Sequence, residues 1–133
     1  MVGVALDPFA GTGKVHRLQR KGLRTVGIEI EPEWAEIHPQ TVVGNALHLP
    51  LPDNTFDAIV TSPCYGNRMA DSHNAQDDSH RNTYTHVLGR KLHEDNAGAM
   101  QWGDKYRHFH LQAWMEAYRV LKPERGKRRR PMI

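Results

Sequence analysis

The chain has 133 residues, which is enough for one domain and too few for two full domains. A net charge of +3 and a mean hydropathy of -0.68 describe a weakly basic, polar chain. The single cysteine excludes an internal disulfide framework, and the apolar start at residues 1–9 is too short to span a membrane. We therefore expect a cytoplasmic protein without membrane association.

The first third of the chain predicts two strands joined by a turn and a helix. Residues 2–6 form a short apolar run that stops at Asp7, as a buried parallel strand does at its carboxyl end. Residues 14–21 indicate a weak helix that Gly22 closes. The β-branched run at residues 25–30 predicts the second strand.

The next segment continues the alternation of helix and strand. Pro32 favours the first turn of a short helix that ends before Pro39. Residues 41–43 and 56–60 predict the third and fourth strands. Strands that alternate with helices predict an α/β fold with a parallel sheet and flanking helices.

Beyond the fourth strand the pattern changes. Residues 66–103 are rich in His, Asp, Asn and Ser and show no period, which is typical of a functional loop or a disordered one. Asp104 is a plausible N-cap for a helix that Pro123 ends, and its apolar stripe comprises Phe109, Ala113, Trp114, Ala117, Tyr118, Val120 and Leu121. Residues 124–133 show no strand pattern. We expect a domain at 1–123, including the polar loop, and a basic tail at 124–133.

Three successive strand ends carry residues suited to a nucleotide-like cofactor. The turn at residues 7–13 contains Gly11 and Gly13, which allow a tight turn and close approach of a ligand to the backbone. Glu29 follows the second strand, where a carboxylate can accept hydrogen bonds from both ribose hydroxyls. Asn45 follows the third strand and can bind an adenine edge. A dinucleotide fingerprint and a P-loop are both absent from this turn.

These segments resemble a known family. The stretches DPFAGTG, GIEIEPEW, GNALHLPLPDNTFD and TSPCY are similar to those of class I methyltransferases that use S-adenosylmethionine, and most similar to the DNA amino-methyltransferases. The resemblance implies a Rossmann-like fold, here with an incomplete parallel sheet in strand order 3-2-1-4 because the chain stops where a fifth strand would begin. It also implies a cofactor site formed by Asp7, Phe9, Ala10, Gly11, Gly13, Glu29 and Asn45.

The same resemblance implies a catalytic corner after the fourth strand. The Ser62 hydroxyl oxygen and the Pro63 carbonyl oxygen would accept hydrogen bonds from an exocyclic amino group, and Tyr65 would stack on the base. Such acceptors make the nitrogen more nucleophilic and direct it at the methyl group. Stacking, at about 1–3 kcal/mol per base, offsets part of the cost of flipping the base out of a duplex. Serine in this motif favours cytosine N4 over adenine N6, and a base in RNA is an alternative target.

Cys64 departs from the family pattern, which has a second proline at this place. Loss of the proline ring removes a constraint on the backbone that holds the acceptor carbonyl. The Pro63-Cys64 pair also resembles the proline-cysteine nucleophile of cytosine C5 methyltransferases, in which a thiolate attacks the ring. That chemistry is the more distant alternative, because the Ser62 and Tyr65 pair fits the amino class.

The polar loop and the tail suggest partners. Histidines at positions 73, 80, 86 and 93 match no standard zinc spacing, and we expect no metal. Candidates for phosphate contact in the loop are Asn67, Arg68, Arg81, Arg90 and Lys91. A fourth strand at the edge of the sheet would expose its backbone, so we expect a homodimer or a partner chain to cover it. The alternative to an active enzyme is a catalytically impaired remnant that binds S-adenosylmethionine or DNA.

Overall fold

The structure is a computed structural model, and it describes residues 3–62, 93, 96, 103–124 and 128–129. Two compact units divide the chain: Met1–Ser62 with Gln112–Ile133, and Pro63–Leu111. Among the described residues, no helix has the length and apolar character required to span a bilayer.

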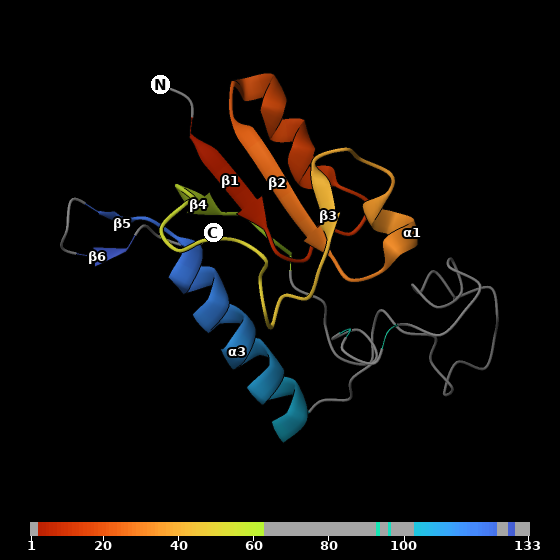
Figure 1. Ribbon diagram of the computed structural model, residues 1–133, viewed down its shortest axis with the longest axis vertical. Helices are drawn as coiled ribbons and strands as arrows, with labels where there is room; N and C mark the ends of the chain where they lie inside the picture. The colour runs from red at the N-terminus through yellow and green to blue at the C-terminus, as the bar shows by residue number, and fades with distance from the viewer. Residues whose placement is uncertain (1–2, 63–92, 94–95, 97–102, 125–127, 130–133) are drawn as a thin grey trace. The chain divides into compact units, whose positions relative to one another are not determined.

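A four-stranded parallel sheet forms the centre of the first unit (Figure 1). Its strands are β1 (Val4–Asp7), β2 (Arg24–Glu29), β3 (Thr41–Val43) and β4 (Ala58–Ile59), in the order β3-β2-β1-β4. The predicted α/β fold and strand order are therefore confirmed. Because all pairs are parallel, the carboxyl ends of the four strands lie along one edge of the sheet.

The helix predicted at residues 14–21 is present with those bounds as η1 (Lys14–Lys21), but it is a 3₁₀-helix rather than an α-helix. Val15 and Leu18 lie three residues apart, which is the period of a 3₁₀-helix, so they form one apolar column in which Val15 is buried and Leu18 is half-buried. Gly22 closes η1 in the left-handed conformation, and its N–H donates to the carbonyl of Gln19.

The helix α1 (Pro32–Ala35) begins at the predicted proline and ends earlier than expected. Its buried residues, Trp34 and Ala35, leave Ile37 largely exposed. The strand β3 follows with the predicted bounds, and the N–H of Gly44 donates to the carbonyl of Glu29 at 3.0 Å.

The fourth strand is shorter than the predicted 56–60, and Phe56 pairs instead with the chain that leaves the long helix. The helix α3 (Asp104–Val120) ends before Pro123, and the next residue, Leu121, pairs with Phe56. The Phe56 N–H donates to the Val120 carbonyl at 2.9 Å, and the Lys122 N–H donates to the Phe56 carbonyl at 2.8 Å. Phe56 therefore forms a parallel bridge with Leu121 instead of extending the pairing between β4 and β1.

The prediction that no strand follows the long helix is wrong. Two short strands, β5 (Pro123–Glu124) and β6 (Arg128–Arg129), pair antiparallel. Pro123 begins β5, a position at which its missing N–H costs no interior ladder bond. So short a pair carries no alternation of apolar and polar residues, which is why the composition gave no signal.

The hydrophobic core of the first unit lies between the sheet and the last turns of α3. Its buried members are Leu6, Ile28, Leu49, Phe56, Ile59, Ala117, Val120 and Leu121. Trp114 packs against this cluster, as the predicted apolar stripe of the helix requires, but Tyr118 of that stripe is exposed. In the second unit the described residues include the start of α3, where Asp104 and Arg107 form an exposed ion pair at 3.4 Å.

Candidate functional site

The glycine turn after β1 leaves its backbone accessible at the carboxyl edge of the sheet. Gly11 and Gly13 have φ values of 55° and 94°, so both adopt the left-handed conformation that glycine tolerates best. A Cβ placed on Gly11 would meet no atom within 4 Å, which leaves open space over this residue. The Ala10 N–H donates to the Ile28 carbonyl at 2.9 Å and ties the turn to β2.

Glu29 links this turn to the end of β2. One carboxylate oxygen accepts a hydrogen bond from the Gly11 N–H and the other accepts one from the Glu31 N–H, both at 2.8 Å. Its side chain is buried, and that burial raises the pKa of Glu29 against the opposing effect of the hydrogen bonds from the Glu31, Gly11 and Ile30 N–H groups. The two predicted cofactor residues Gly11 and Glu29 are therefore brought into direct contact.

Asp7 connects the ends of two neighbouring strands. Its Oδ1 atom accepts the Phe9 N–H at 2.9 Å and the Thr61 hydroxyl at 2.5 Å. Burial raises the pKa of Asp7, while the hydrogen bonds from Thr61 and Phe9 act in the opposite direction. Thr61 was not among the predicted site residues, yet it couples the end of β1 to the segment that follows β4.

The remaining predicted cofactor residues lie along the same edge. The ring of Phe9 makes an edge contact with Trp114 of α3, with centroids 5.9 Å apart. Asn45 follows β3, and its side-chain oxygen accepts the Leu47 N–H at 2.9 Å in a local turn. This turn fixes the backbone next to the place where the resemblance puts adenine.

Ser62 is exposed directly after Thr61, so the structure places the first predicted catalytic residue beside the end of β1. Adjacent, parallel β1 and β4 satisfy the geometric requirement that the glycine turn and the catalytic corner share one edge. Pro63, Cys64 and Tyr65 lie outside the described residues. The loop candidates for phosphate contact, Asn67, Arg68, Arg81, Arg90 and Lys91, also lie outside them.

A buried histidine, His16, packs closely against the glycine turn, and it was not among the predicted site residues. The two ring nitrogens of His16 each lie 2.7 Å from a threonine hydroxyl, that of Thr25 on β2 and that of Thr41 on β3. The ring is 5% exposed and stacks on His38 at 3.8 Å between centroids. A Cβ on Gly13 would lie 2.9 Å from the ring, so the turn is fitted closely against it.

Protonation of His16 is expected to destabilise the fold. Burial, followed by the nearby His38, lowers the pKa of His16 below its ordinary value of 6.5. The unfolded chain therefore binds this proton more readily, and the stability present above about pH 6.5 is lost as the pH falls through the folded pKa. We expect urea unfolding of the wild type to show this loss of stability between about pH 7.5 and about pH 5.5.

The His16→Gln variant should lose less stability over this pH range. The same change at the exposed His48 should leave the loss as in the wild type. Equal pH dependence in all three proteins would contradict the assignment to His16.

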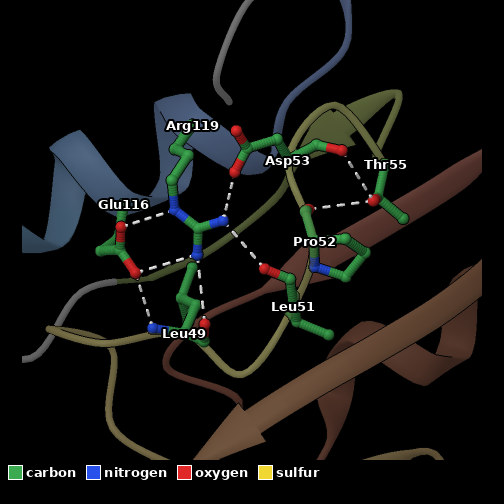
Figure 2. A network of polar contacts seen from close by, with 7 residues as sticks. All are labelled: Leu49, Leu51, Pro52, Asp53, Thr55, Glu116 and Arg119. Carbon is green, nitrogen blue, oxygen red and sulfur yellow. Dashed lines mark hydrogen bonds and ion pairs between the residues drawn. The ribbon is translucent and has the colours of Figure 1, made fainter.

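An arginine on α3 holds the segment that leads into β4 (Figure 2). The Arg119 guanidinium donates to the carbonyl oxygens of Leu49 and Leu51 and to the Asp53 carboxylate, at 3.1, 2.9 and 2.6 Å. It also binds both carboxylate oxygens of Glu116, at 2.7 and 3.0 Å. Hydrogen bonds to Arg119 lower the pKa of Glu116, whose carboxylate accepts the Leu49 N–H as well. Segment 49–53 is thereby fixed to the helix.

Comparison with known proteins agrees with this architecture. The sequence pattern of the methyltransferase domain family matches residues 6–80. No curated protein sequence matches the chain.

Solved structures share the fold at low sequence identity. A Pyrococcus horikoshii protein has a TM-score of 0.54 at 19% identity, with 92% of this chain and 46% of that chain covered. A S-adenosylmethionine-dependent methyltransferase from Methanosarcina mazei has a TM-score of 0.53 at 21% identity, with 92% and 49% covered. A putative one from Methanococcus maripaludis has a TM-score of 0.52 at 19% identity, with 92% and 45% covered. The chain thus spans less than half the length of each of these structures.

The sheet order, the glycine turn and the acid at the end of β2 define a Rossmann-like protein of the class I methyltransferase type. The chain belongs to the methyltransferase domain family, because the family pattern covers more than half of it. The cofactor of this class is S-adenosylmethionine, as the resemblance implied.

Proposed function

We propose that this chain holds S-adenosylmethionine over the glycine turn and transfers its methyl group to an exocyclic amino group of a base in DNA. Cytosine N4 is the favoured target, ahead of adenine N6. The observation that carries the proposal is the hydrogen bond between Thr61 and Asp7, which puts the strand end bearing Ser62 beside the strand end bearing the turn.

The carboxyl edge fits the cofactor at two points. Open space over Gly11 allows a ligand to lie directly on the backbone. Each Glu29 oxygen that accepts one backbone N–H retains capacity for a further hydrogen bond, so the carboxylate can receive both ribose hydroxyls without giving up the turn. Asn45 would meet the adenine amino group through its side-chain oxygen.

The chain's own residues would act on the nucleophile. S-adenosylmethionine supplies an electrophilic methyl carbon on a positively charged sulfur. The Ser62 oxygen and the Pro63 carbonyl would accept hydrogen bonds from the two N–H groups of the target amine. These bonds would hold the lone pair of the nitrogen in line with that carbon. The nitrogen would form its new bond to that carbon as the C–S bond pair stays on sulfur, and it would release one proton to water.

A direct assay tests this function. Purified protein is incubated with isotopically labelled S-adenosylmethionine and duplex DNA, and the digested nucleosides are then separated. We expect label in N4-methylcytosine, and Ser62→Ala should lower kcat about 100-fold, the loss typical of one group that stabilises a transition state.

The control for this assay is a variant that removes a different hydroxyl group, that of Thr55. The Thr55 hydroxyl donates to the local carbonyls of Pro52 and Asp53, so Thr55→Ala should leave kcat within about twofold. Label in 5-methylcytosine would contradict the amino assignment in favour of the Cys64 route. Cofactor binding by calorimetry without any labelled nucleoside would select the binding remnant instead. The homodimer or partner chain at the β4 edge stays a prediction.

A further inference from the structure

The side chains of η1 are sorted into three columns by its 3₁₀ geometry. In such a helix residues i and i+3 eclipse one another. One column contains the buried Val15 and the half-buried Leu18. A second contains His16 and Gln19, which both reach the Thr25 hydroxyl, at 2.7 and 2.8 Å, as eclipsed side chains should.

The third column is entirely cationic and exposed. It consists of Lys14, Arg17 and Arg20, and all three are exposed to solvent. At about 2.0 Å of rise per residue, successive members are separated by about 6 Å along the helix axis. An α-helix would instead offset each member from the previous one by about 60° around the axis, since its turn contains 3.6 residues.

Nothing in the described part of the chain neutralises this column. Residues 8–28 contain no aspartate or glutamate. No carboxylate of a described residue lies within ion-pair distance of Lys14, Arg17 or Arg20. The column thus presents three uncompensated positive charges in a straight row.

We propose that Lys14, Arg17 and Arg20, here termed the cationic column, bind consecutive phosphates of one DNA strand. A straight row of evenly spaced cations complements a backbone that carries one anion per nucleotide. Guanidinium groups add bidentate geometry to the charge attraction. The column begins one residue after Gly13, so a strand that delivers a base to the catalytic corner beside the glycine turn can continue along η1 (Figure 1, orange-red helix). This inference rests on the proposed DNA substrate.

Equal charge changes on and off the column provide the test. Arg17→Gln/Arg20→Gln removes two cations of the column. Lys21→Gln/Arg24→Gln removes two exposed cations outside it, with the same change in net charge. Binding of a short labelled DNA duplex is measured by fluorescence anisotropy without cofactor, over roughly 50 to 200 mM salt.

The measured quantity is the slope of log K against log salt concentration. Each phosphate contact with duplex DNA contributes about −0.9, so loss of two contacts should make the slope shallower by about 1.8. The off-column pair should change the slope by less than half of that. Equal effects of the two pairs, no effect of either, or no DNA binding by the wild type would overturn the inference.

Methyl transfer by the same proteins separates this inference from the proposed function. A wild type that binds DNA through the column but labels no base would support the cationic column and contradict the methyltransferase proposal. In the opposite outcome, the wild type labels DNA while Arg17→Gln/Arg20→Gln leaves the slope of log K against log salt concentration unchanged. That result would support the methyltransferase proposal and overturn DNA binding by the cationic column. Preference for RNA over duplex DNA in the binding assay would overturn the assignment of the partner.

Discussion

Glu29→Gln is expected to weaken S-adenosylmethionine binding about 10- to 100-fold. The carboxylate oxygens accept the Gly11 and Glu31 N–H groups, and under the proposed function they also receive the ribose hydroxyls. Glutamine keeps one oxygen and presents an NH₂ group in place of the other, so one backbone N–H faces a donor. Hydrogen bonds to charged groups contribute about 1.5–3 kcal/mol, and each 1.4 kcal/mol is about tenfold in affinity.

Isothermal titration calorimetry measures this change, and Glu33→Gln provides the control. Glu33 is exposed in the first turn of α1, so the same loss of one negative charge there should leave the dissociation constant within about twofold. Urea unfolding of both variants shows whether the effect is confined to binding. A Glu29→Gln protein that binds the cofactor as tightly as wild type would exclude Glu29 from the cofactor site.

Much of the sheet could be predicted from the sequence because its signals are local. The strand β3 has the predicted bounds, and β1 and β2 differ from the prediction by a few terminal residues. Their β-branched runs and the glycine turn between them are short-range patterns that need no tertiary information. The fourth strand was overextended because Phe56 pairs with Leu121, a contact between residues far apart in the chain.

The sequence could predict a site residue only where that residue lies at or just after the end of a strand. Gly11 and Glu29 were found because one lies in the turn that follows β1 and the other is the last residue of β2. Thr61 was missed because its role depends on Asp7, which belongs to the neighbouring strand. A threonine at the end of a strand gives no signal of its own. His16 was missed because Thr25 and Thr41, whose hydroxyls form hydrogen bonds with its ring nitrogens, belong to two later strands. Residues that support the site through tertiary contacts carry no local signature.

These supporting contacts share one feature, which is that each joins two or more elements that lie apart in the chain. Asp7 joins β1 to the segment after β4, His16 joins η1 to β2 and β3, and Arg119 joins α3 to segment 49–53. A methyl transfer requires donor and acceptor atoms to be held within a few tenths of an ångström of the reactive geometry. Variants of such residues should therefore alter stability and positioning together.

Arg119→Ala is expected to lower the free energy of unfolding by about 1.5–3 kcal/mol, the range for hydrogen bonds to charged groups. The substitution leaves the carbonyls of Leu49 and Leu51 without this donor and leaves the Glu116 carboxylate without its bidentate partner (Figure 2). Arg119→Lys should recover little of the loss, because an ammonium group cannot reproduce the planar fork that reaches several acceptors at once.

Arg107→Ala is the matched control for this experiment, since it is the same change on the same helix. Its ion pair with Asp104 joins side chains that are 73% and 88% exposed, and such pairs contribute at most about 1 kcal/mol. Alanine is equally favourable to the helix at both positions, so helix propensity cancels from the comparison. Urea unfolding monitored by circular dichroism measures both variants. Equal losses at positions 107 and 119 would show that the Arg119 side-chain contacts do not stabilise the fold.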